Sequence, residues 1–107
     1  MIGIGKWEAE ISTPMFKAKG VVEIVDNNGK YEFRYDLPGR FKNAKIRYYD
    51  IREVGSDTLT GKGEISLLPG KVIEVTATFK GDKMNGFVKV PIMRGMKIQF
   101  KNGRRIG

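Results

Sequence analysis

Five side chains of this sequence have the chemistry to bind a polar ligand: Tyr31, Tyr35, Tyr48, Asp50 and Arg52. Phenol and guanidinium groups donate hydrogen bonds, and a carboxylate accepts them, so an enclosed set of this kind could hold a charged or hydroxylated head group. We therefore predict a ligand-binding site from these five residues. The alternative is that Asp50 and Arg52, two residues apart on one strand face, pair only with each other. A buried pair of that kind would be costly without further hydrogen bonds.

Other kinds of chemistry are excluded by residues that the sequence lacks. It contains no His and no Cys, so the usual pairs of nucleophile and base cannot form, and neither can a thiolate or imidazole zinc site. Carboxylate pairs such as Glu8 and Glu10 fall on the wet face of an expected strand, where they are solvated. We therefore expect no enzymatic activity, no metal and no cofactor.

Apolar and polar residues alternate with a period of two along almost the whole chain, which is typical of half-buried β-strands. The expected strands cover residues 6–12, 17–24, 31–37, 45–54, 58–67, 73–79, 84–90 and 96–100. They predict an all-β fold, an eight-stranded antiparallel up-and-down meander closed into a β-barrel, with residues 1–107 as a single domain. Closure of an even number of strands would remove both sheet edges.

Two kinds of turn support this order of strands. Pro-containing segments at 13–16, 37–40, 68–71 and 91–95 alternate with Asn, Asp and Gly turns at 26–29, 54–57 and 80–83. Only an up-and-down meander places each kind at its own end of the barrel. An internal repeat agrees, because the pattern of residues 57–61 recurs 25 residues later at 82–86.

The expected strand 45–54 is irregular, because neither of its faces is consistently apolar. A register that begins with Ile46 and Tyr48 continues inward with Asp50 and Arg52, while Tyr49 and Ile51 point outward. A bulge near Asp50 would exchange the faces partway along the strand. As outward apolar residues, Tyr49 and Ile51 predict a homodimer contact.

The inward positions combine small and bulky side chains, so the interior is either filled or able to admit one small ligand. We favour a mostly filled core. The small inward residues are Ala9, Ala18, Gly20, Gly61, Gly63, Ala77 and Gly86, and the bulky ones are Trp7, Tyr31, Phe33, Tyr35, Tyr48, Phe79, Met84, Met96 and Phe100.

The segment Gly5-Lys6-Trp7 on the first strand, the meander and an Arg beyond the last strand together resemble the calycins, which include lipocalins, fatty-acid-binding proteins and avidins. The chain is most similar to small bacterial calycin-like domains of unassigned function. The resemblance implies that an Arg lies across the ring of Trp7 and closes one end of the barrel. Continuing the inward parity of the last strand selects Arg104, with Arg105 as the alternative. A cation–π contact of this kind contributes about 0.5–2 kcal/mol.

The charge is unevenly distributed along the chain. Of the net charge of +8, the residues from Lys80 onward carry +7, because this stretch contains five Lys and three Arg but only one acidic residue, Asp82. This pattern indicates either a solvated edge, which we favour, or a surface for an anionic partner. The cations expected on that surface are Lys89, Lys97 and Lys101, near Arg94, with Phe87 as an exposed aromatic.

The leading functional prediction is a non-enzymatic barrel that holds a small apolar or amphipathic molecule between Trp7 and the Pro-turn end. The alternatives are a filled scaffold whose basic face binds an anionic partner such as nucleic acid, which we expect less, and a structural or assembly role through Tyr49 and Ile51. The sequence has no apolar run long enough to span a membrane. It also has no basic segment followed by an apolar one at its start, which predicts a cytoplasmic location by default.

Overall fold

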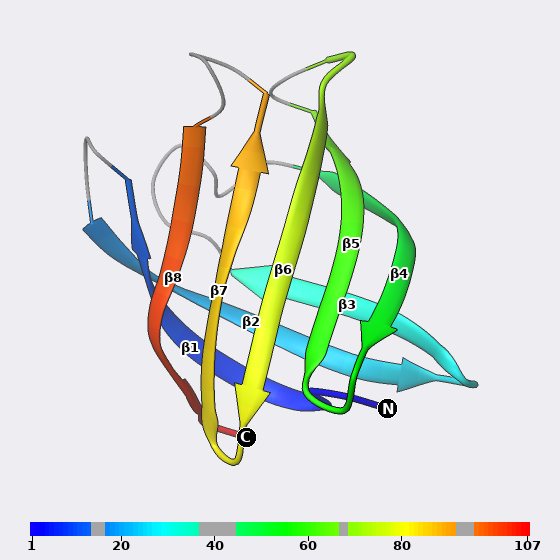
Figure 1. The fold of residues 1–107 in the computed structure, drawn as a ribbon, viewed down its shortest axis with the longest axis vertical. Helices are drawn as coiled ribbons and strands as arrows, with labels where there is room; N and C mark the ends of the chain where they lie inside the picture. The colour runs from blue at the N-terminus through cyan, green and yellow to red at the C-terminus, as the bar shows by residue number, and fades with distance from the viewer. Residues whose placement is uncertain (14–16, 37–44, 67–68, 92–95) are drawn as a thin grey trace.

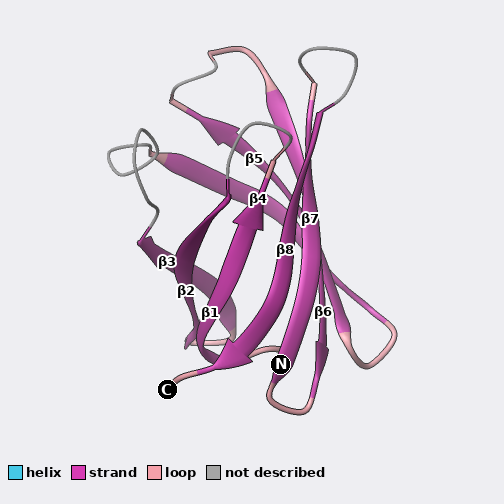
Figure 2. Ribbon diagram, turned by 90° about the vertical axis from the view of Figure 1, so that its left-hand side faces the viewer, coloured by secondary structure: helices cyan, strands magenta, loops and turns pink. Residues whose placement is uncertain are grey.

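Eight antiparallel strands form one sheet in the computed structural model, in the order β3-β2-β1-β8-β7-β6-β5-β4 (Figures 1 and 2). The sheet curls into a nearly closed barrel, which confirms the predicted all-β, up-and-down fold. The strands are β1 (Gly5–Ser12), β2 (Lys17–Asn27), β3 (Lys30–Asp36), β4 (Ile46–Val54), β5 (Thr58–Ile65), β6 (Val72–Lys80), β7 (Lys83–Val90) and β8 (Met96–Arg105).

The structure describes residues 1–13, 17–36, 45–66, 69–91 and 96–107. Four sequence predictions therefore lie wholly or partly outside the described residues. They are the Pro-containing turns around 14–16, 37–40, 67–68 and 92–95, the last of which includes Arg94. The side chain of Met96 is also outside the description, although its backbone begins β8.

The described hairpin turns have the conformations that their residues predict. Asn28 and Gly29 both have positive φ angles, 54° and 86°, between the paired residues Asn27 and Lys30. Two such residues in a two-residue loop form a type I′ turn, whose twist matches that of the flanking strands. Gly81 begins the turn from β6 to β7 with φ 60°. These turns follow the last residues of β2 and β6, which end at the same end of the barrel.

The first and last strands of the chain, β1 and β8, pair in the middle of the sheet through a backbone ladder that runs from Trp7 opposite Arg105 to Ser12 opposite Gln99. Among the described residues, no backbone ladder joins β3 to β4, which stand at the two ends of the strand order. The prediction that closure removes both sheet edges is therefore wrong at this one place. We refer to the gap between β3 and β4 as the seam.

Apolar side chains fill the barrel in two clusters. The first crosses the barrel, with Trp7 fully buried at 0% exposure, and combines residues of β1, β2, β5, β6 and β7. The second lies toward the Pro-turn end, on Ile73, Val88 and Val90, and Phe100 packs against both clusters. The buried members of the first cluster are Trp7, Ala9, Ile24, Leu59, Phe79 and Met84.

A bulge in β8 reverses the parity of its last residues. Phe100 lies opposite Gly86 and Gly103 lies opposite Met84, so two residues of β8 occupy the space of one on β7. The second of them, Asn102, has a φ angle of 53°, in the left-handed region that Asn tolerates better than most residues. Inward positions beyond the bulge are therefore odd-numbered.

This parity corrects the predicted partner of Trp7. The guanidinium of Arg105, and not that of Arg104, lies over the indole ring, with its Cζ 4.4 Å from the centroid. Arg105 also donates to the carbonyl oxygen of Ile4 and pairs with Asp82 at 3.1 Å. Arg104 faces outward, 68% exposed, and pairs with Glu8. The prediction of Arg104 was wrong because it counted through the bulge as a regular strand.

The backbone conformation and the surroundings of Gly5 explain why the Gly5-Lys6-Trp7 segment begins with glycine. Gly5 has a φ angle of 140°, and a Cβ at this position would collide with the Nη1 atom of Arg105. The indole nitrogen of Trp7 donates to the carbonyl oxygen of Gly3 at 2.9 Å. Glycine, tryptophan and the terminal arginine are therefore parts of one packing arrangement.

We expect Arg105→Ala to lower the free energy of unfolding by about 1–3 kcal/mol, because it removes a cation–π contact and a hydrogen bond from the end of the core. Arg104→Ala is the matched control and should cost no more than about 0.5 kcal/mol, since it removes only an exposed ion pair. Urea unfolding followed by Trp7 fluorescence measures both. Equal losses for the two variants would contradict the assignment of Arg105.

Candidate functional site

The three tyrosines predicted to bind a ligand come together at the seam between β3 and β4. Tyr35 accepts a hydrogen bond from the backbone N–H of Ile46 at 2.9 Å. Tyr31 accepts one from the N–H of Ile2 at 2.7 Å and donates to the Oε2 atom of Glu53 at 2.9 Å. The hydroxyl of Tyr35 thus binds a backbone group of β4, and that of Tyr31 links the N-terminal segment to a side chain of β4.

Contacts between aromatic rings also join β3 and β4 at the seam. The ring of Tyr48, on β4, lies 5.0 Å from that of Phe33 and 6.2 Å from that of Tyr35, both on β3. Burial, together with the nearby Tyr35, raises the pKa of Tyr48 far above its ordinary value. Burial, and then the carboxylate of Glu53, raises the pKa of Tyr31. Both hydroxyls are therefore neutral at physiological pH, and the seam is held by side chains.

Asp50 and Arg52 do not join this set, which corrects the prediction that they face inward. Tyr49 lies opposite Lys62 and Arg52 opposite Thr60, so the strand contains a bulge, and Asp50 has a φ angle of 56°. The side chains of Asp50 and Arg52 are 38% and 72% exposed and pair with each other at 3.1 Å. The bulge and the mutual pairing considered from the sequence are therefore both present, but in solvent.

The same bulge separates the two residues expected to form a homodimer contact. A Cβ on the inward-facing Gly61 would meet the Cδ1 atom of Ile51 at 2.6 Å, so Ile51 covers Gly61 on the inner face. Tyr49 remains outside, with the guanidinium of Arg47 5.9 Å from its ring centroid. The expectation that Tyr49 and Ile51 share one outer surface is wrong, and homodimerisation itself stays a prediction.

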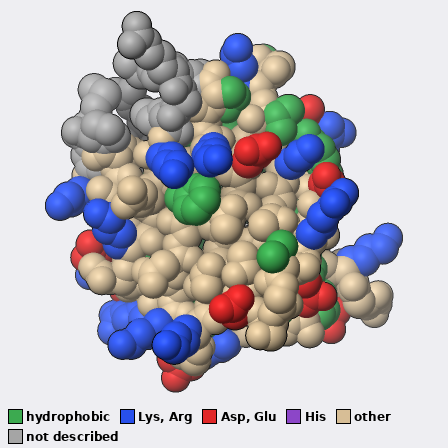
Figure 3. All heavy atoms as spheres, viewed as in Figure 1, with side chains coloured by type: hydrophobic (Ala, Val, Ile, Leu, Met, Phe, Trp, Pro, Cys, Tyr) green, Lys and Arg blue, Asp and Glu red, His purple; other side chains and the backbone are tan. Residues whose placement is uncertain are grey.

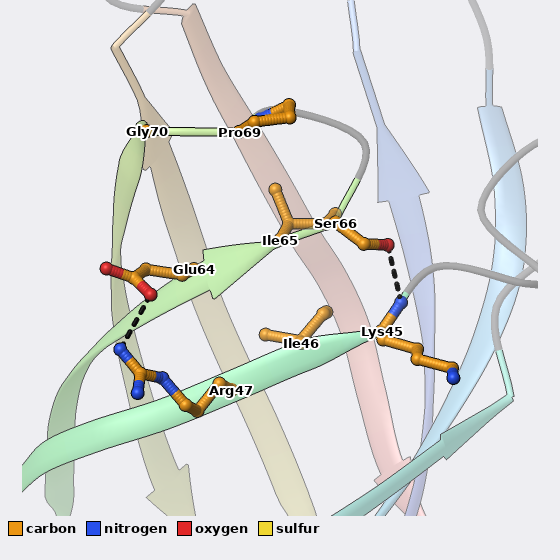
Figure 4. Close-up of a pocket in the computed structure, with 8 residues that line it drawn as sticks. All are labelled: Lys45, Ile46, Arg47, Glu64, Ile65, Ser66, Pro69 and Gly70. Carbon is orange, nitrogen blue, oxygen red and sulfur yellow. Dashed lines mark hydrogen bonds and ion pairs between the residues drawn. The ribbon is translucent and has the colours of Figure 1, made fainter.

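A hollow at the Pro-turn rim lies between the start of β4 and the end of β5, and most of its polar groups already have partners within the protein (Figure 4). Arg47 and Glu64 point toward each other and pair at 2.7 Å. The hydroxyl of Ser66 accepts the backbone N–H of Lys45 at 3.0 Å. The nearby Ile65 packs against the second core cluster. The groups at this rim mostly satisfy one another.

A second hollow lies on the outer face of β6, β7 and β8 and has a different character. Its lining joins uncharged hydrogen-bonding side chains with one outward aromatic and two lysines. The lining residues are Thr76, Thr78, Asn85, Gly86, Phe87, Lys97, Gln99, Phe100 and Lys101. Strand register explains the grouping, because Gln99, Phe87 and Thr76 lie side by side across the three strands.

Cations stand at both ends of this hollow. At one end Lys89 lies between Lys97 of β8 and Glu74 of β6, and at the other Lys83 lies between Lys80 and Arg104. In the described residues, no carboxylate is within ion-pair distance of any of the five lysines that β6, β7 and β8 carry. Figure 3 shows this side of the molecule, with blue side chains above and below a largely neutral middle and a few red acidic side chains near both groups.

Comparison with family models, curated proteins and solved structures finds no match to this chain. Among the described residues, no cluster of acidic side chains has the arrangement of a metal site. That part of the chain also contains no helix suited to crossing a membrane.

The basic residues of the outer hollow were predicted from the sequence, whereas the neutral residues between them were not. The sequence indicated Lys89, Lys97, Lys101 and Phe87 as an outer basic surface. The neutral middle, with Thr76, Asn85 and Gln99, was not predicted from the sequence. Their common alternation on three consecutive strands was the available signal, and only the strand register places them side by side.

We expect stability to fall as the pH rises above about 10, the ordinary tyrosine value, because the raised pKa values of Tyr31 and Tyr48 keep protons on the folded state that the unfolded state releases. Urea unfolding at a series of pH values between about 8 and 11 measures this loss. Tyr48→Phe should lose less stability than the parent over that range. Identical pH dependence in the two proteins would show that Tyr48 is not a buried titrating group.

Proposed function

We propose that this barrel is a non-enzymatic binding module that holds an extended polyanion against the outer face of β6, β7 and β8. The observation that carries the proposal is the arrangement of lysines without carboxylate partners at both ends of a hollow lined by hydrogen-bonding side chains. Such cations attract an anionic ligand over a distance, and the neutral groups between them hydrogen-bond to it at contact.

The spacing of the cations favours a polymer over a small anion. Lys89 and Lys83 lie at opposite ends of β7, six residues apart, which corresponds to about 20 Å of extended strand. Along the direction of the strands, Lys101 on β8 lies between the positions of Lys83 and Lys89. One small anion would contact a single end of the hollow, whereas a chain of regularly spaced anionic groups reaches all three levels.

Burial of the inner wall supports a ligand on the outside. At the Pro-turn end the inward side chains of Ile11, Ile73 and Val90 are all at least 94% buried, and Trp7 closes the other end. An interior of this kind leaves little apolar wall for a ligand to cover. The small apolar ligand inside the barrel, expected from the sequence, stays a prediction that native mass spectrometry of the purified protein would test.

We expect the protein to bind a fluorescein-labelled single-stranded oligodeoxythymidylate of about 12 nucleotides at low ionic strength, with an affinity that falls steeply as salt is added. Replacing Lys89 and Lys97 together by Gln should reduce the slope of log K against log salt by about 1.4, since each lost phosphate contact contributes about 0.7 for a single strand. Fluorescence anisotropy measures the slope.

The matched control is the double variant Lys17→Gln and Lys19→Gln, which removes the same charge from exposed positions on β2, a strand that β1 separates from β8. This control should keep nearly the parental slope. Equal effects of the two double variants would mean that net charge alone drives binding, and no binding at low salt would refute the proposed function.

A further inference from the structure

The structure assigns a more specific ligand to this face: we infer that Phe87 is a stacking platform for a base, and that the polyanion is single-stranded nucleic acid. The inference rests on the proposed function and deepens it. Phe87 lines the outer hollow, between Gln99 on β8 and Thr76 on β6, and the outward residues around it are polar. An aromatic ring on a basic strand surface is the arrangement by which proteins bind unpaired bases.

The position of Phe87 within the sheet has no explanation in the core. Its neighbour Val88 points to the inner face, where it is buried in the second cluster, and Gly86 lies opposite the inward residues Ala77 and Phe100. Phe87 points the other way and remains only partly buried. Its ring therefore contributes to the outer surface and not to the packing of the barrel interior.

Lys97 occupies the place where a base would stack. Its ammonium group lies 4.8 Å from the centroid of the Phe87 ring, a cation–π contact between neighbouring strands. A nucleotide could replace this contact on both sides, because its base would stack on the Phe87 ring and its phosphate would pair with the Lys97 ammonium group. We infer that Lys97 moves from the ring to a phosphate when the strand binds.

The surroundings of the ring suit an unpaired base better than they suit other polyanions. Asn85, Gln99 and Thr76 present donors and acceptors next to Phe87, and both kinds of group occur on the edge of every base. Sulfated sugars and acidic peptides carry anionic groups but no aromatic face to lie on the ring. The combination of cations with a ring is therefore what distinguishes nucleic acid.

The test uses the unmodified protein and two oligonucleotides of equal length and charge, one of thymidine and one with abasic sites in place of most bases. Fluorescence anisotropy at low salt should show binding of the abasic strand that is about tenfold weaker, as expected for the loss of base stacking. Equal affinity for the two strands, with salt-dependent binding of both, would overturn the stacking role and leave the proposed function standing.

Three variants locate the effect. Phe87→Leu should weaken binding of the thymidine strand about tenfold and leave the abasic strand unchanged, while Phe87→Tyr should keep the parental affinities. Lys97→Gln should weaken both strands, because it removes a phosphate contact. If Phe87→Leu weakened both strands equally, or Lys97→Gln neither, the assignment would be wrong. No binding of either strand at low salt would instead refute the proposed function itself.

Discussion

The bulge at Asn102 determines which side chains of the last strand face the core and which face solvent. One extra residue in β8 exchanges the parity beyond Phe100, so that Gly103 and Arg105 lie on the inner side and Arg104 on the outer side. Gly103 accepts the exchange because it has no side chain, and a Cβ there would collide with the backbone oxygen of Met84. The cation over Trp7 therefore depends on the left-handed backbone of one asparagine.

The barrel is held around its circumference by two kinds of interaction. Seven strand pairs use backbone ladders, while the seam between β3 and β4 uses the tyrosine hydroxyls and tilted, edge-on contacts between aromatic rings. Tyr31, Tyr35 and Tyr48, which the sequence predicted as ligand-binding residues, instead join the two edge strands of the barrel. With the inner face used for packing and for the seam, the free polar chemistry of the described residues lies outside.

The overall fold was predictable because it follows from patterns that are regular along the chain. Alternation identified the strands, and the contrast between Pro turns and Asn-Gly turns identified their order. The errors in side-chain orientation came from the two bulges, since one extra residue reverses every later assignment on a strand. The sequence indicated the bulge near Asp50 but not the one at Asn102, and the open seam between β3 and β4 is a separate error. Both bulges have an Asx residue with positive φ, Asp50 and Asn102, and an Asp or Asn inside an alternating strand was the available signal. The neutral middle of the outer hollow was less predictable, because it depends on the register of three strands.

The central claim is that this barrel binds its ligand on the outside of β6, β7 and β8 and uses its interior for packing. Backbone amide chemical shifts, recorded while a single-stranded oligonucleotide is added at low salt, locate the contact directly. We expect shifts concentrated in residues 85–89 and 97–101, with the amides around Trp7 and the seam tyrosines unchanged. Shifts concentrated at the seam or along the inward positions of β1 and β2 would contradict it.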